Sequence, residues 1–258
     1  MKPTGARIVA DAFDTQLEFL RKKLDIPTER WNDIWQEQHD RAFVAAGAMQ
    51  ADLLADLHGA VNRAIEDGQS LEDFRAGFDD LVTKHGWLAD KSGEYRAWRA
   101  RLIYETNLRT SYAAGRYAYL SENTDAMPYW RWNHSDASIH PRPSHVALDG
   151  LILPASDPFW SRSYPPCGFS CKCTVDGVNQ AAIKAQHWEV GIAPADFEPD
   201  PGWAYAPGAS VSDELADFLS QKTEALPTEI RQDLMSALAD RVTDSPILAS
   251  VWRLLGGR

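Results

Sequence analysis

The stretch LSENTDAMPYWRWN, residues 120–133, contains the point at which the pattern of the sequence changes. Before Asn123, apolar residues recur at steps of three and four, the spacing of one face of an α-helix. After Asn123, the aromatic run of residues 129–133 alternates with a period of two, which is typical of a strand. We therefore predict an α+β fold, with a helical N-terminal half and a small, mostly antiparallel sheet within residues 128–176.

Three helices are predicted upstream of this change. An apolar stripe from Trp31 to Ala64 indicates one long helix that follows the candidate N-cap Thr28 and ends at Gly68. The motif Ser-Leu-Glu-Asp at residues 70–73 opens a second helix, and a third is expected over residues 95–120.

The downstream half is predicted to be more broken. Residues 145–153 favour a strand, a turn and a second strand, and residues 171–175 favour a last short strand. Residues 193–208 are rich in proline and glycine and are interpreted as a linker, followed by two acidic amphipathic helices near 212–224 and 227–241. The expected organisation is a helical N-terminal region (1–92), a core with a basic helix and the sheet (93–178), and a linker with a helical acidic C-terminal tail (179–258).

Composition limits the class of protein. The chain has 258 residues, of which 44% are hydrophobic and 24% charged, so a folded protein with a sizeable core is expected. The formal net charge of -11 argues against a nucleic-acid binder that uses its whole surface. No apolar run approaches the roughly 20 residues of a membrane helix, and the first residues do not resemble a signal peptide. We therefore expect a cytoplasmic protein without a membrane partner.

The third predicted helix is the one basic segment of an acidic chain. Its face has two interpretations, either a solvated surface with internal salt bridges or a contact for DNA or an acidic partner protein. The candidate binding residues are Arg96, Arg99, Arg101, Arg109 and Arg116.

Residues 134–173 hold the side chains that could carry chemistry. They include three histidines, His134, His140 and His145, and all three cysteines, Cys167, Cys171 and Cys173. Thiolate and imidazole ligands at short spacing suit zinc, with His145 joining the three cysteines. Two alternatives remain, namely small buried thiols that only pack, and a Cys171–His145 nucleophile pair. The sequence contains no phosphate-binding loop, dinucleotide-binding turn, His-Glu-x-x-His or Gly-x-Ser-x-Gly motif.

Several motifs in one order resemble the phage Mu F-like minor head proteins, which form the phage head morphogenesis family. The resemblance covers roughly residues 12–178. The motifs are the helix RLIYETNLRTSYAAGRY (101–117), PYWRW (128–132), RPSH (142–145), LDG (148–150), DPFW (157–160) and YPPCGFSCKC (164–173). His145, Cys171 and Cys173 match the family pattern, whereas asparagine or histidine often replaces Cys167.

This resemblance implies a minor capsid protein of a Mu-like phage or prophage. Such a protein would act in procapsid assembly with the portal protein and other head or scaffold proteins, and in handling packaged DNA. Its expected location is the host cytoplasm during assembly and then the interior of the phage head. The resemblance implies no enzymatic activity and no certain cofactor. A structural zinc ion, and a toxin-like or metal-dependent enzyme that uses the His/Cys segment, remain the alternatives.

Overall fold

The computed structural model describes residues 5–138, 140–210 and 236. The chain divides into two compact units, Met1–Ala209 and Ser210–Arg258, and every element named below lies in the first. The predicted helices near 212–224 and 227–241 lie outside the described residues. The first unit combines helices with a small antiparallel sheet, so the α+β prediction is confirmed.

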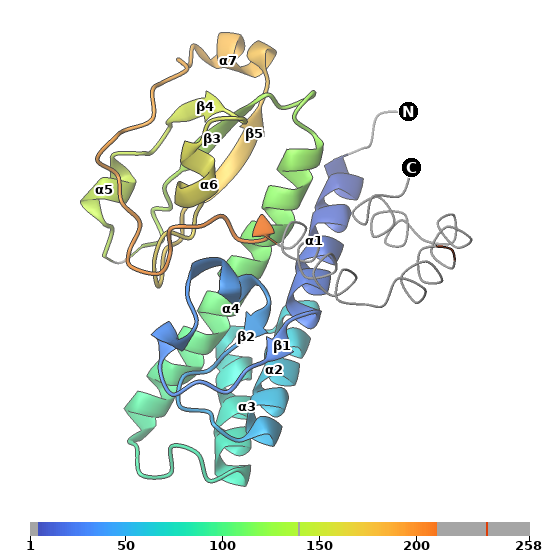
Figure 1. Cartoon of the computed structure of the whole chain (residues 1–258), viewed down its shortest axis with the longest axis vertical. Coiled ribbons are helices and arrows are strands. Elements are labelled where there is room, and N and C mark those ends of the chain that lie inside the picture. Colours follow the sequence, from blue (N-terminus) through green and yellow to red (C-terminus); the bar gives the residue numbers. More distant parts are fainter. Residues whose placement is uncertain (1–4, 139, 211–235, 237–258) are drawn as a thin grey trace. The chain divides into compact units, whose positions relative to one another are not determined.

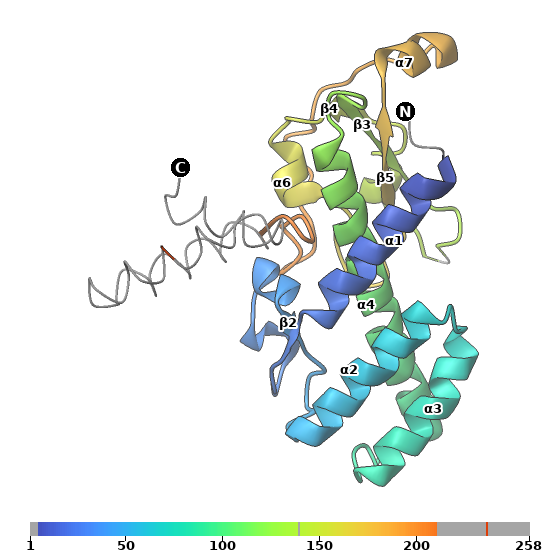
Figure 2. The same cartoon turned by 90° about the vertical axis from the view of Figure 1, so that its right-hand side faces the viewer.

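Four helices build the N-terminal half (Figures 1 and 2). They are α1 (Gly5–Arg21), α2 (Ala51–Glu66), α3 (Leu71–Lys84) and α4 (Gly93–Glu122). In both views α1 lies beside α4, and α2 and α3 pack near the beginning of α4. Helix α4 takes part in two hydrophobic cores. Its first half belongs to the core between the helices, and its second half belongs to the core around the sheet.

Helix α3 begins at its predicted signal, and α4 begins two residues before the predicted start at residue 95. Ser70 Oγ accepts a hydrogen bond from the Asp73 amide, and Asp73 accepts one from the Ser70 amide, which completes a capping box. Ser92 caps α4 in a similar way by accepting a hydrogen bond from the Tyr95 amide. The first amide groups of a helix have no hydrogen-bond acceptor within the helix, and these capping side chains provide one.

The predicted single helix that follows Thr28 and ends at Gly68 is wrong in its first part. Residues 24–50 instead form two short 3-10 helices and two short parallel strands before α2 begins. These are β1 (Leu24–Asp25), η1 (Trp31–Asp33), η2 (Gln36–Asp40) and β2 (Ala42–Phe43). Gln36 (φ 46°) and Gly47 (φ 82°) have left-handed backbone conformations that interrupt a continuous α-helix. The apolar residues between Trp31 and Met49 are therefore spaced as in a helix, although this part of the chain forms no long helix.

The sheet contains three antiparallel strands in the order β4-β3-β5. They are β3 (Tyr129–Asn133), β4 (Ile152–Pro154) and β5 (Thr174–Val178). The predicted alternation in β3 is confirmed, because Trp130 and Trp132 are buried and their neighbours are half-buried. Trp132 pairs with Val175, and the register of β3 against β5 continues to Asn133 opposite Thr174.

Gly177 allows β5 to approach the end of α4. A Cβ atom at this position would lie 2.5 Å from Met127 Sδ and 2.6 Å from a methyl group of Leu120, well inside van der Waals contact. A side chain at this position would therefore require Met127 and Leu120 to shift at the exit from α4.

Two strand predictions need correction. Residues 145–153 form a helical turn, α5 (Pro143–Val146), and then β4, because Pro143 stands at the first helical position, which its fixed φ favours. Cys171 and Cys173 precede β5 and do not lie within it. Two further short helices were not predicted, α6 (Phe159–Ser163) and α7 (Gln180–Gln186).

The expected linker at residues 193–208 is packed into the unit. Phe197, Trp203 and Tyr205 are buried, and the Gly208 amide donates a hydrogen bond to Asp40 Oδ2 (2.9 Å). The proline and glycine content here serves an irregular segment with aromatic anchors, so the linker interpretation is wrong.

One aromatic group joins this segment to the N-terminal half. Trp31 stacks on His39, with ring centroids 3.8 Å apart, and on Trp203 at 5.6 Å, while Phe169 meets Trp203 edge-on at 5.1 Å. We call these four residues, Trp31, His39, Phe169 and Trp203, the aromatic clasp.

His39 makes the stability of the clasp dependent on pH. Burial, with the nearby Lys23 ammonium, lowers the pKa of His39 to about 3. The ordinary pKa of histidine in an unfolded chain is about 6.5. The stabilisation is therefore complete above pH 6.5 and is lost as pH falls toward 3, at up to about 1.4 kcal/mol per pH unit.

We expect the free energy of unfolding, measured by chemical denaturation, to fall between pH 6.5 and pH 5 in the wild type. The slope should be smaller in His39→Phe, which keeps a ring for stacking on Trp31 but cannot be protonated. His140→Gln removes an exposed histidine and is the matched control. Equal slopes in the wild type and His39→Phe would contradict the prediction.

Within residues 5–138 and 140–210, no helix is both long and apolar enough to cross a membrane.

Candidate metal centre

Three side chains that can bind metal lie together beside the sheet. The possible ligand atoms of His145, Cys171 and Cys173 all lie within 4.8 Å of one another. His145 Nδ1 is 3.5 Å from Cys171 Sγ and 3.7 Å from Cys173 Sγ. The three residues are only 3%, 3% and 8% exposed. The structure thus forms a compact, shielded group from residues that the sequence separates by up to 28 positions.

The helical turn α5 places His145. The side chain of Arg142, directly before α5, donates hydrogen bonds to the Phe169 carbonyl (3.0 Å) and to Asp200 (2.7 Å). The His145 ring meets Trp132 and Phe197 edge-on, with centroids 6.0 and 5.7 Å away. The imidazole is therefore fixed in orientation by its aromatic neighbours.

A turn before β5 places the two thiols. The Cys171 amide donates to the Gly168 carbonyl, and Ser170 has a left-handed backbone (φ 60°). Alternate side chains along a strand stand about 6.6–6.8 Å apart, whereas the sulfur atoms of Cys171 and Cys173 lie within 4.8 Å. The turn thus brings the sulfur atoms together, and the short spacing of the Cys-x-Cys pair is no obstacle to joint ligation.

The hydrogen bond between the two thiols shifts their pKa values in opposite directions. A hydrogen bond from the Cys173 thiol, together with the contact to His145, lowers the pKa of Cys171. The same hydrogen bond and burial raise the pKa of Cys173. The two neighbouring sulfur atoms thus differ in how readily they lose a proton.

Cys167, the fourth predicted ligand, does not join this group. It is fully buried, and burial raises its pKa well above the ordinary value of a thiol. Its carbonyl accepts a hydrogen bond from the Asp200 amide (3.0 Å). In this structure Cys167 packs in the core and supports the turn that carries the other two cysteines.

His134 is the neighbour that the sequence analysis did not select. Its Nδ1 lies 3.6 Å from Cys173 Sγ, and its amide donates to Asp149. It is half-buried, and it lies outside the set of atoms that are all within 4.8 Å of one another. The strand register offers a signal for it, since Asn133 pairs with Thr174 and the next pair in sequence is His134 with Cys173. His140 is exposed and apart from the group.

Two of the five predicted binding arginines are paired internally. Arg96 forms an ion pair with Asp79 at 3.4 Å on α3. Arg116 forms one with Asp176 at 2.7 Å and also donates to the Val175 carbonyl. These contacts attach α4 to α3 and to β5, so both side chains have structural roles.

The other three arginines differ in accessibility. Arg99 is buried, donates to the Ala46 carbonyl (2.7 Å) and lies over the Trp87 ring. Arg101 is exposed and Arg109 is half-buried. Neither of these two makes an ion pair with a described residue. The prediction of a contact for DNA or an acidic protein therefore rests on Arg101 and Arg109.

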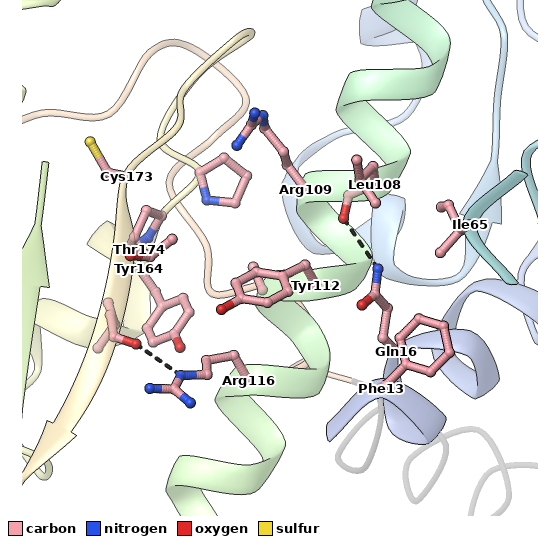
Figure 3. Close-up of a pocket in the computed structure, with 14 residues that line it drawn as sticks. Phe13, Gln16, Ile65, Leu108, Arg109, Tyr112, Arg116, Tyr164, Cys173 and Thr174 are labelled. Carbon is pink, nitrogen blue, oxygen red and sulfur yellow. Dashed lines mark hydrogen bonds between the residues drawn. The ribbon is translucent and has the colours of Figure 1, made fainter. Parts of the chain in front are cut away.

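A pocket of about 370 Å³ has both Arg109 and Cys173 among its lining residues (Figure 3). It lies between α1, α4 and the segment that leads to β5, and Tyr112 and Tyr164 are among its lining residues. The Cys173 sulfur points away from the pocket in Figure 3. The candidate metal centre and the pocket thus lie on opposite sides of the chain at Cys173.

Comparison with known proteins finds a family that is similar to the central part of the chain. Residues 55–176 match the family described as Phage Mu protein F like protein, which confirms the resemblance inferred from the motifs. The matched range contains His134, His145 and all three cysteines. No solved structure shows significant similarity to the chain.

Two curated proteins are similar over longer stretches. The chain is 26% identical to the "Putative capsid assembly protein F" of Escherichia phage Mu, over 88% of this chain and 62% of that protein. It is 33% identical to the "Mu-like prophage FluMu F protein" of Haemophilus influenzae, over 65% of this chain and 42% of that protein. The chain thus spans less than two thirds of the length of each relative.

Proposed function

We propose, from the premise that residues 55–176 are a phage Mu protein F-like segment, that this chain acts in head morphogenesis of a Mu-like phage or prophage. The observation that carries the proposal is the similarity to the phage Mu protein over 88% of this chain. That similarity extends beyond the family segment. It therefore includes the packed segment 197–208 as well as the sheet and its helices.

The portal protein and other head or scaffold proteins are the proposed partners, and packaged DNA is a further one. The proposed location is the host cytoplasm during assembly and the interior of the head afterwards. The support is the similarity to the putative capsid assembly protein of phage Mu, together with the two arginines of α4 that have no ion pair among the described residues.

Non-enzymatic action is part of this proposal. The side chains that could serve as a nucleophile and a base, Cys171 and His145, are each only 3% exposed. A substrate would have to displace the aromatic side chains of Trp132 and Phe197 to reach them. The alternative of a toxin-like or metal-dependent enzyme therefore has no accessible site in this group.

Removing the gene from its phage or prophage tests the assembly role. We expect particles without this protein to fail in head assembly, as judged by electron microscopy of lysates, and a copy supplied in trans to restore normal heads. The tagged protein should co-purify with the portal protein encoded in the same cluster. Normal heads without the protein would contradict the proposal.

Charge reversal tests the proposed contact with DNA. In Arg101→Glu/Arg109→Glu we expect weaker binding to double-stranded DNA in a mobility-shift assay. Loss of two phosphate contacts should also reduce the slope of log K against log salt by about 1.8.

Lys184→Glu is the matched control for this assay, since Lys184 is an exposed cation on α7. Its binding should be close to that of the wild type. Equal losses in the control and the double variant, or a wild type that does not bind DNA, would rule out these two arginines as the contact.

A further inference from the structure

The distances around the His/Cys group match the edges of a zinc coordination sphere. Zinc binds thiolate sulfur at about 2.3 Å and histidine nitrogen at about 2.0–2.1 Å in tetrahedral geometry, so neighbouring sulfur and nitrogen ligands stand about 3.6 Å apart. The corresponding distances here are 3.5 Å and 3.7 Å from His145 Nδ1 to the two sulfur atoms. The two nitrogen–sulfur distances therefore match two edges of such a tetrahedron, and the two sulfur atoms lie within 4.8 Å of each other.

His134 lies beside this group at the distance expected between two neighbouring zinc ligands. Its Nδ1 is 3.6 Å from Cys173 Sγ, and its half-buried ring borders the group at the end of β3. Trp132 and Phe197 cover the His145 side. His134 is thus the ring that can complete the sphere by turning toward Cys171.

We propose that His145, Cys171 and Cys173 bind one zinc ion, with His134 as the fourth ligand. The sulfur and nitrogen donors select zinc over the hard cations magnesium and calcium, which take oxygen ligands. The ion connects the end of β3, the turn α5 and the segment before β5. It holds together the two segments that connect these elements, and its role is structural.

Metal content of the full chain provides the first test. We expect about one zinc ion per chain in protein purified without chelators, measured by inductively coupled plasma mass spectrometry. Cys171→Ser and Cys173→Ser should lose at least about 10-fold in zinc content. Cys167→Ser removes a buried thiol outside the group and should keep its zinc. Protein that stays zinc-free after dialysis against zinc would overturn the proposal.

Absorption spectroscopy at the zinc edge identifies the ligands in the wild type and needs no variant that might fail to fold. The expected first shell has two sulfur atoms at about 2.3 Å and two nitrogen atoms at about 2.0 Å. A shell with one nitrogen and one water oxygen would exclude His134 as the fourth ligand, and a shell without sulfur would overturn the site.

Two histidine variants separate the role of His134 from a general effect on the loop. His134→Ala should bind zinc about 10-fold or more weakly in competition with a chromogenic chelator. His140→Ala changes an exposed histidine in the same loop and should bind zinc like the wild type. Equal affinities in both variants would remove His134 from the ligand set. These results are independent of head assembly, so the zinc site and the proposed function can fail separately.

Discussion

Trp203→Ala is expected to lower the free energy of unfolding by about 3–5 kcal/mol, the usual cost of removing a large buried aromatic side chain. Trp203 is 1% exposed, and its ring contacts Trp31 and Phe169 within the aromatic clasp. The alanine would leave a cavity where three distant segments meet. Chemical denaturation would measure the loss, and thermal unfolding should shift down by about 10 °C.

Trp98→Ala is the matched control for this prediction, because Trp98 is 51% exposed on α4. Its effect should stay within about 0.5 kcal/mol, as for most surface substitutions. Similar losses in the two variants would mean that residues 197–206 are not part of the folded core. The loss in free energy of unfolding for Trp203→Phe should lie between those of the two alanine variants. Phenylalanine keeps a ring, and the indole nitrogen of Trp203 has no hydrogen-bond partner among the described residues.

Gly168→Ala is expected to lower the free energy of unfolding by about 2–4 kcal/mol, from overpacking and a weakened charged contact. A Cβ atom at Gly168 would lie 2.1 Å from Asp200 Oδ2 and 3.0 Å from Arg142 Nη2. The carboxylate would have to leave Arg142, which holds the beginning of α5 and hence His145. The backbone of Gly168 is not left-handed, so the expected loss is steric.

A double-mutant cycle tests this cause. If the clash with Asp200 is responsible, adding Gly168→Ala to Asp200→Ala should cost much less than adding it to the wild type. Gly77→Ala on α3 is the control, because the space around Gly77 is open. Alanine in a helix should stabilise the protein there by about 0.5–1 kcal/mol. Additive losses at Gly168 and Asp200 would show that the clash is not the cause.

Local signals predicted the elements that depend on local interactions. The capping residues Ser70 and Ser92 lie within three positions of the amides that they satisfy. The alternation around Trp130 and Trp132 reflects a strand buried on one face. Such patterns depend only on nearby residues, and α3, α4 and β3 formed as expected.

Segments that depend on distant partners were predicted poorly. Trp31 has helical spacing in the sequence, but its ring packs on Trp203, 172 positions later. Periodicity contains no information about such a partner, so the helix was predicted too long and residues 193–208 were mistaken for a linker. The tertiary contacts outweighed the local preference in both places.

The candidate site likewise contains residues that the sequence could identify and residues that it could not. Ligand chemistry and the family pattern selected His145, Cys171 and Cys173, and the structure places them together. His134 was not selected, because its proximity to Cys173 follows from the register between β3 and β5. Cys167 was included on spacing alone, and its position in the core could not be read from the sequence.

The contact between Gly208 and Asp40 has a consequence for the order of events during translation. The two residues are 168 positions apart. Because ribosomes add about 5–20 residues per second, the Gly208 amide is synthesised roughly 10–30 s after Asp40. During that interval Trp31 lacks the cover of Trp203. The nascent chain thus exposes this aromatic surface until residues 197–208 emerge, and this delay is the time in which a chaperone can engage the N-terminal half.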